Sequence, residues 1–131
     1  MNSINHVLML GNLTRDPELR YTPAGTAVCQ LVVALNRRWK DQAGEPQQET
    51  TFVEVTVWAK QAETVSAYLT KGRAVVIEGR LQQDTWETEA GERRSRLRVV
   101  AQRVTFLSGT MHQSAPADDA APDWVTEEAE R

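Results

Sequence analysis

The sequence predicts an all-β protein: a small five-stranded barrel with one helix between the third and fourth strands, followed by a disordered acidic tail. Three observations carry this prediction. Five segments alternate apolar and polar residues with the period of a β-strand. One segment among them has apolar residues at helical spacing, and the last part of the chain is rich in Ala, Pro and acids.

The first two predicted strands flank a connection that contains turn residues. Residues 4–13, INHVLMLGNL, form the first strand, and residues 27–39, AVCQLVVALNRRW, form the second. Residues 16–28 contain two prolines and a glycine, which favour turns, so we expect a connection there. Cys29, the single cysteine, lies among apolar residues and is expected to be a small buried hydrophobe.

The third predicted strand carries two aromatic residues on its polar side. It covers residues 50–58, TTFVEVTVW, and follows a polar loop at residues 40–49. Successive side chains of a strand point to opposite faces, so three valines form a core face: Val53, Val55 and Val57. The opposite face then holds Phe52, Glu54, Thr56 and Trp58. The valines suffice for a core, so the two rings need another explanation.

The helix and the last two strands complete the expected barrel. Residues 60–72 have the helical period, and one face of that helix holds Ala62, Val65 and Leu69. Residues 73–86 form the fourth strand and residues 94–107 the fifth, joined by a charged hairpin loop at residues 87–94. On the fourth strand the inward positions are Val75, Ile77 and Leu81.

Five strands with one helix between the third and fourth follow the order of the oligonucleotide/oligosaccharide-binding (OB) fold, a Greek-key barrel. We therefore predict one OB domain at residues 1–108 and a disordered tail at residues 109–131. The net charge of −3 conceals a division between them. The domain carries 14 Lys/Arg and 12 Asp/Glu, a net +2, whereas the tail carries one Arg and six acids, a net −5.

Aromatic and basic residues interleave at the outward positions of the predicted barrel. The rings are Trp39, Phe52, Trp58 and Trp86. An exposed aromatic cluster marks a contact surface for a protein, a sugar or a nucleic acid. Arginines and lysines lie near Trp39, Trp58 and Trp86, and Arg93, Arg94, Arg96 and Arg98 lie across the last hairpin from Trp86. Cations that follow phosphates and rings that stack on unpaired bases favour single-stranded nucleic acid. Each ring taken alone could also be a core or subunit-interface residue, but the four together favour a contact surface.

Two longer motifs resemble a known family. GNLTRDPELRYTPAG at residues 11–25 and YLTKGRAVVIEGRL at residues 68–81 are similar to the bacterial single-stranded DNA-binding proteins, and the resemblance extends over residues 4–107. It implies sequence-independent binding and protection of single-stranded DNA in replication, recombination and repair. It also implies base stacking on Trp39, Phe52, Trp58 and Trp86. We expect phosphate contacts from Arg37, Arg38, Lys40, Lys60, Lys71, Arg73, Arg80, Arg94 and Arg96.

The resemblance further implies a homotetramer, and two departures bear on assembly and partners. Val53 stands where many members have a histidine near a subunit interface. The family's tail ends in an acidic tip with a terminal phenylalanine that recruits replication and repair proteins, whereas this chain ends in Arg131. Either a variant docking segment exists, or recruitment is absent or different. The docking segment would comprise Asp118, Asp119, Asp123 and Trp124.

Other classes of protein fit the residues less well. One cysteine and two scattered histidines, His6 and His112, give no metal-ligand spacing, and no catalytic constellation or cofactor motif is visible. We therefore expect no enzyme activity, no metal and no cofactor. Without a signal peptide or an apolar run of membrane length, we expect a cytoplasmic, nucleoid-associated protein. The alternatives are an OB-fold protein-interaction module of the primosome type and a cold-shock-type RNA binder.

Overall fold

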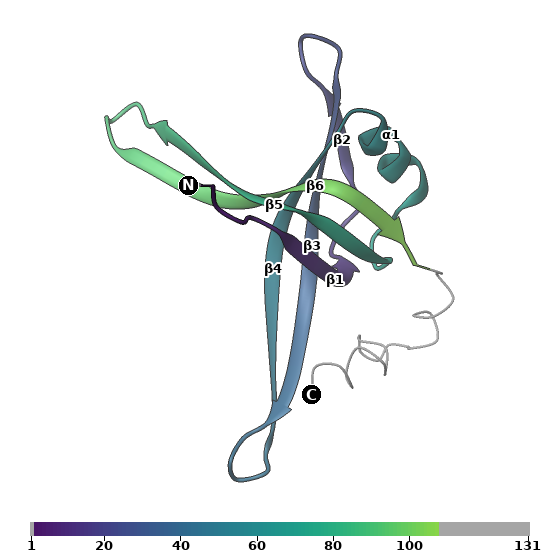
Figure 1. Cartoon of the computed structure of the whole chain (residues 1–131), viewed down its shortest axis with the longest axis vertical. Coiled ribbons are helices and arrows are strands. Elements are labelled where there is room, and N and C mark those ends of the chain that lie inside the picture. Colours follow the sequence, from purple (N-terminus) through teal and green to yellow (C-terminus); the bar gives the residue numbers. More distant parts are fainter. Residues whose placement is uncertain (1, 108–131) are drawn as a thin grey trace.

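The computed structural model describes residues 2–107, which form six strands and one helix (Figure 1). No helix in this part of the chain is long and apolar enough to cross a membrane. In chain order the elements are β1 (Val7–Leu13), β2 (Glu18–Tyr21), β3 (Ala27–Lys40), β4 (Pro46–Trp58), α1 (Ala59–Tyr68), β5 (Ala74–Glu87) and β6 (Arg93–Phe106).

Five of the strands close into a barrel, which confirms the predicted fold class. The sheet order is β1-β5-β6-β4-β3-β2, and an additional pairing of β1 with β3 closes the ring and leaves β2 outside it. The pairing of β4 with β6 is parallel, and every other pairing is antiparallel. The helix lies between β4 and β5 in the chain, as the sequence predicts.

The region predicted as a plain connection contains a strand, so that interpretation was incomplete. Within residues 16–28, β2 pairs with β3 from Glu18↔Gln30 to Tyr21↔Ala27. The turn residues do not separate the two strands but close a tight hairpin, in which the Thr22 N–H donates to the Thr26 carbonyl at 2.9 Å. A strand of four residues is too short for its alternation to stand out in the sequence.

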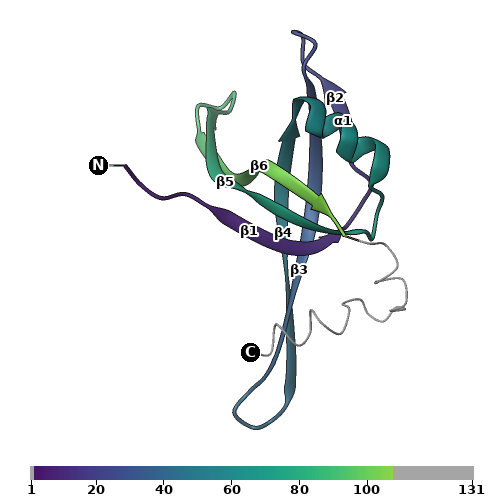
Figure 2. The ribbon, with the colours of Figure 1, turned by 45° about the vertical axis from the view of Figure 1, so that its right-hand side comes forward.

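The predicted polar loop at residues 40–49 is also shorter than expected. The ladder between β3 and β4 runs out to Lys40↔Pro46, so half of this stretch is strand. Asp41 makes this possible because its carboxylate accepts the N–H groups of Ala43 at 2.9 Å and Glu45 at 2.8 Å. The result is a long hairpin that projects from the barrel (Figure 2). A second hairpin, of β5 and β6, projects in another direction.

The core confirms most of the predicted inward positions. Odd-numbered residues of β3, β4 and β5 fill the barrel, and Ala62 and Val65 of α1, with Leu69 at its C-terminal cap, lie against them. Cys29 is fully buried, and that burial raises the pKa of its thiol to about 11. Two expectations were only partly right. Leu81 is exposed because β5 has left the barrel by that point, and Val53 is half-buried at the start of the hairpin.

Candidate nucleic-acid interface

Neighbouring strands of the barrel present their even-numbered side chains on one surface. Thr56 of β4 pairs with Gln30 of β3 and with Val100 of β6, and Val100 pairs with Arg80 of β5. Directly paired residues share a face, so this register aligns the outward positions of all the strands. We call this surface the sheet face. Its members include Glu18, Arg20, Gln30, Phe52, Glu54, Trp58, Arg80, Gln82, Asp84, Trp86, Arg94, Arg96 and Arg98.

Three of the four predicted stacking rings lie on the sheet face and are open to solvent. Phe52 is 65% exposed, Trp58 40% and Trp86 45%. The structure therefore confirms that both aromatics of the third strand point away from the core of the chain. Large rings at this exposure offer a flat apolar surface to a ligand.

Trp39 lies elsewhere and in a different environment. It is five residues along β3 from Ala34, the partner of Phe52, so it points to the opposite side of the hairpin. The guanidinium carbon of Arg37 lies 4.2 Å from the centroid of its ring. Arg37 is held in turn by Glu49, with 3.3 Å between Nη1 and Oε1. Trp39 is therefore half-buried beneath an ion-paired arginine of its own strand.

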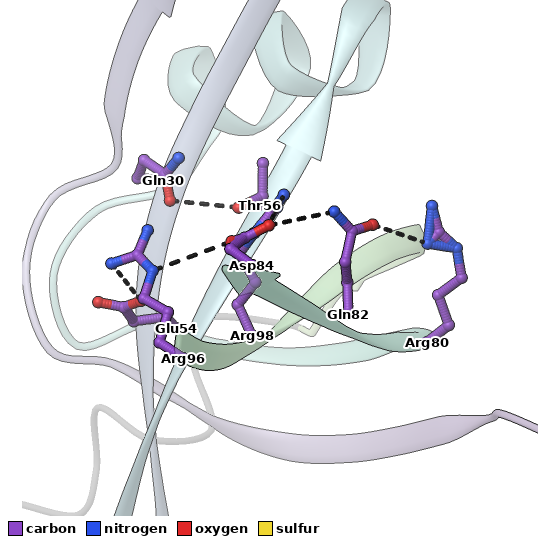
Figure 3. A network of polar contacts seen from close by, with 8 residues as sticks. All are labelled: Gln30, Glu54, Thr56, Arg80, Gln82, Asp84, Arg96 and Arg98. Atoms are coloured by element: carbon purple, nitrogen blue, oxygen red, sulfur yellow. Dashed lines mark hydrogen bonds and ion pairs between the residues drawn. The ribbon is translucent and has the colours of Figure 1, made fainter. Parts of the chain in front are cut away.

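A network of polar side chains occupies the middle of the sheet face (Figure 3). Its strongest link joins Arg98 and Asp84, with Nε donating to Oδ2 at 2.6 Å and Nη2 to Oδ1 at 3.4 Å. The hydrogen bond from Arg98 holds the pKa of Asp84 below its usual range. The Arg98 side chain is only 13% exposed, so neighbouring residues shield most of this ion pair from solvent.

The network continues across β4 and β3. Arg96 Nη1 lies 3.1 Å from Glu54 Oε1, and Arg96 Nε lies 3.9 Å from Asp84 Oδ2. Thr56 is buried beneath these charges and donates from Oγ1 to the side-chain oxygen of Gln30 at 3.3 Å. The middle of the face thus combines guanidinium donors with carboxylate and amide acceptors, and its positive charges are locally balanced.

The predicted phosphate-contacting residues divide into three groups. Arg80, Arg94 and Arg96 lie on the sheet face. Arg37, Arg38 and Lys40 lie on the β3–β4 hairpin, with Arg38 and Lys40 on the same side of β3 as Ala34 and thus Phe52. The last group, Lys60, Lys71 and Arg73, lies around α1.

The three cations around α1 lie at its two opposite ends. Lys60 begins α1 beside Trp58, whereas Lys71 and Arg73 follow its other end. There the Lys71 N–H donates to the Asp16 carboxylate at 2.8 Å, and the Leu13 N–H donates to the Arg73 carbonyl at 3.0 Å. The fold of the described residues therefore does not bring all of the predicted cations close to the aromatic rings.

Two further arginines belong near the sheet face and were missed from the sequence. Arg20 lies on β2, and with Arg15 it lines a pocket beside Glu54. Both fall in or next to the stretch interpreted as a connection, and the short alternation in ELRY was the one signal that could have placed Arg20 on a strand. The proposed docking residues Asp118, Asp119, Asp123 and Trp124 lie outside the described residues.

Known proteins share this sequence pattern and this barrel. The model of the single-strand binding protein family matches residues 4–107. A single-stranded DNA-binding protein of Treponema pallidum is 42% identical over 119 residues, which are 91% of this chain and 66% of that protein. One from Wolinella succinogenes is 43% identical over 103 residues, or 79% of this chain and 64% of that protein. The chain thus spans slightly less than two thirds of these relatives.

Solved structures agree on the fold. A deletion mutant of the single-stranded DNA binding protein from Thermus aquaticus has a TM-score of 0.73 and 32% identity, over 81% of this chain and 51% of that one. A Plasmodium falciparum protein, solved in complex with single-stranded DNA, has a TM-score of 0.75 at 22% identity, over 82% of this chain and 98% of that one, which supports the fold alone. The barrel and the match over nearly all its residues show that this chain belongs to the single-strand binding protein family.

Proposed function

We propose that this chain binds single-stranded DNA without regard to sequence and protects it during replication, recombination and repair. The observation that carries the proposal is the sheet face, where Phe52, Trp58 and Trp86 are exposed among arginines. Family membership and the names of the relatives support it. Duplex DNA hides the faces of its bases, so a surface of separated rings selects unpaired strands.

The proposed mechanism is passive capture. Phosphates are attracted to the cations around the rings, and the bases then stack on Phe52, Trp58 and Trp86. Trp39 joins them once Arg37 has moved off its ring. The remaining predicted cations, including Lys60, Lys71 and Arg73, would guide the strand around the barrel. Binding should weaken with salt, with a slope of about −0.7 for each phosphate neutralised.

We also propose that four copies assemble and act together in the cytoplasm on nucleoid DNA. The outer side of β1 supports an assembly because Leu8 is 66% exposed there, and Ile4, which precedes the strand, is also exposed. A second copy packed on this side of β1 would remove both apolar side chains from water, which is favourable. Sedimentation should give the mass of a tetramer, and Leu8→Glu should lower it.

The tail, in this proposal, serves partner proteins and competes with DNA for the cations of the domain. The net charge of the tail, −5, is opposite in sign to the net charge of the domain, +2. Deleting residues 109–131 should therefore tighten DNA binding at low salt, and unchanged affinity would argue against competition. Loss of binding to replication or repair proteins on the same deletion would support a docking role.

Tryptophan fluorescence is the direct test of DNA binding. The chain has four tryptophans, and stacking on a base quenches an exposed indole. We expect strong quenching by oligo-dT, little by a duplex of equal length, and weaker binding at the higher of two salt concentrations. One long strand bound per four chains would support the tetramer. Unchanged fluorescence with oligo-dT would instead favour the protein-interaction module.

A further inference from the structure

The barrel has a short seam where β4 meets β6. Their parallel pairing covers two positions and ends at Thr56↔Val100. β4 itself continues to Trp58, one of the exposed rings of the sheet face. The ladder with β3 extends over this last part, up to the pair Val28↔Trp58. Within residues 2–107, the end of β4 is therefore paired on the β3 side but not on the β6 side.

A glutamine of α1 binds the backbone of β6 next to this unpaired end, where the helix lies beside the strand (Figure 1). Gln61 accepts the N–H of Val104 through Oε1 at 2.8 Å and donates from Nε2 to the carbonyl oxygen of Gln102 at 3.3 Å. The two bonds flank Arg103, as the bonds of a residue on a parallel neighbouring strand would. One side-chain amide thus takes the place of a peptide group that a longer β4 ladder would supply.

The residues of β6 that Gln61 binds need this partner. Gln102 is the residue that the bulge leaves outside the register of β5 and β6. The parallel register of β4 and β6, continued by two positions, would place Trp58 opposite Gln102. Gln61 therefore fills the gap at the level of the Trp58 ring.

Gln61 also fixes the first turn of α1, which begins directly after Trp58. The helix starts at Ala59, and Trp58 at its N-cap makes no side-chain capping bond. Ala59 has a φ of 61°, so the chain turns sharply between the ring and the helix. Among the residues that the structure describes, the hydrogen bonds that tie this corner to β6 are those of Gln61.

We propose that Gln61 is a positioning residue for DNA binding, which holds the Trp58 ring in the place where a base stacks on it. The proposal deepens the proposed function and rests on it. Gln61 does not touch DNA but acts through the backbone of Trp58. Stacking requires two flat rings to overlap, so a small displacement of the indole lowers its contribution.

Trp58 depends on such support more than the other exposed rings do. Phe52 lies within β4 and Trp86 within β5, and ladder pairs precede and follow each of them along the strand. Trp58 is the last residue of its strand, and the chain leaves the sheet immediately after it. A ring at a strand end is fixed by one flank only, and Gln61 supplies the other.

The test is a double-mutant cycle on the full-length chain, with labelled oligo-dT followed by fluorescence anisotropy. Trp58→Ala should weaken binding about fivefold or more, the factor that corresponds to one lost stack. Gln61→Ala should weaken binding about threefold, because the ring remains but is displaced. In the Trp58→Ala background, Gln61→Ala should change the affinity by less than about 1.5-fold, since no ring is left to position.

A second variant and a spectroscopic signal cover the case in which Gln61→Ala fails to fold. Gln61→Met keeps the length and neutrality of the side chain but lacks the amide, so it should weaken binding as Gln61→Ala does. In chains labelled with 5-fluorotryptophan, Trp58→Phe identifies the fluorine resonance of Trp58. That resonance should shift in Gln61→Met without DNA, whereas a loss of stability alone leaves it in place in the folded protein.

Asn5→Ala is the matched control. The Asn5 amide also makes two hydrogen bonds to a strand backbone, donating to the Leu81 carbonyl at 2.9 Å and accepting the Leu81 N–H at 2.8 Å. Leu81 pairs with Val99 in the middle of the β5–β6 ladder, so its strand is held without Asn5. Asn5→Ala should leave the affinity for oligo-dT within about 1.5-fold of wild type and the Trp58 resonance unchanged.

The outcomes separate the positioning role from the proposed function. If Gln61→Ala weakens binding equally with and without the Trp58 ring, Gln61 acts elsewhere and the proposal is wrong. Unchanged affinity in Gln61→Met, whatever its stability, would overturn it as well, while DNA binding by the rings would stand. If the wild type does not bind oligo-dT, the proposed function fails and the positioning role fails with it.

Discussion

The sheet face and the β3–β4 hairpin use the same kinds of residue in opposite ways. On the sheet face, Trp86 is open to solvent while Arg98 is held down by Asp84 of the neighbouring strand. On the hairpin, Arg37 lies over Trp39 and is held there by Glu49 of the neighbouring strand. A ring is exposed in one region and covered in the other.

The difference follows from what lies beneath each region. Around Trp58 the sheet face covers the barrel core, whose odd-numbered residues fix which side chains point outward, and the β5–β6 ladder carries the same register out to Trp86 on its projecting hairpin. The β3–β4 hairpin extends beyond the core, so both of its sides meet solvent. The ring of Trp39 is therefore covered by Arg37 of the same strand. A base can therefore reach the rings of the sheet face directly, whereas on the hairpin it must first displace Arg37.

The largest expected effect comes from breaking the scaffold under the sheet face. Gly79 pairs with Ala101 at a bulge that leaves Gln102 unpaired, and an added Cβ would collide with the carbonyl oxygen of Val100. We expect Gly79→Ala to lower the free energy of unfolding by about 3 kcal/mol, measured by urea denaturation.

Gly44 is the matched position in the hairpin turn. Its φ is 82°, but no atom lies near an added Cβ. Gly44→Ala should cost only about 1 kcal/mol, from the left-handed backbone alone. Equal losses for the two variants would show that the barrel tolerates backbone movement at the bulge.

The next largest effect is a loss of DNA affinity that distinguishes the exposed ring of Trp86 from the covered ring of Trp39. Alanine substitution of a stacking ring in single-strand binders costs about 1–3 kcal/mol per base, so Trp86→Ala should weaken oligo-dT binding by that amount. Trp39→Ala should cost less, since a base that stacks there loses the contact between Arg37 and the ring, worth about 0.5–1 kcal/mol at an exposed site. Fluorescence titration of both variants measures the difference.

Arg37→Ala sharpens the same comparison. It uncovers Trp39 but also removes a cation, so its salt dependence must be measured alongside its affinity. If Trp39→Ala weakens binding as strongly as Trp86→Ala, the covered ring is as accessible as the open ones. If Trp39→Ala and Trp86→Ala each lose less than about 0.3 kcal/mol of binding free energy, both rings have a structural role and do not stack on bases.

The sequence predicts the sheet face better than it predicts the hairpin, for a physical reason. Alternation identifies the outward positions wherever one side of a strand is buried, as it does for Phe52 and Trp58. Trp39 lies beyond the core, where both sides are solvated and alternation carries no such information. The sequence therefore grouped it with the other rings, and only the register separates them.

Pairing across strands is the other feature that the sequence did not reveal. The link between Arg98 and Asp84 depends on which residues face each other across the β5–β6 hairpin, and so does the pair of Arg96 and Glu54 across β6 and β4. The pocket further requires β2, which is too short to show a pattern of its own. Charges counted along the chain thus overstate how many arginines remain free for phosphates.

The free energy of unfolding measured at acid and neutral pH tests the contribution of the Asp84–Arg98 pair. Because the pKa of Asp84 is lowered in the folded state, its ionised form stabilises the fold above the unfolded value of about 3.9, and this stabilisation is lost as the pH falls through the folded pKa. Asp84→Asn should lower the urea midpoint at neutral pH, and the difference from wild type should shrink below about pH 4.

The hairpin again provides the control for this pair. Glu49→Gln breaks an exposed ion pair, which contributes about 0–1 kcal/mol, so its midpoint at neutral pH should stay close to wild type. If the difference between Asp84→Asn and wild type is the same at neutral and acid pH, the ionisation of Asp84 does not stabilise the sheet face.

The smallest expected effect is a gain in stability at the end of β4. Ala59 turns the chain from Trp58 into α1 with a φ of 61°, in the left-handed region that disfavours a residue with a Cβ. Ala59→Gly should relieve this strain but give the unfolded chain more freedom, for a net gain of about 0.5–1 kcal/mol. It therefore reverses the sign expected for Gly44→Ala at a similar backbone angle. Thermal unfolding measures both, and a loss of stability in Ala59→Gly would mean that the Ala59 methyl group supports the position of Trp58 on the sheet face.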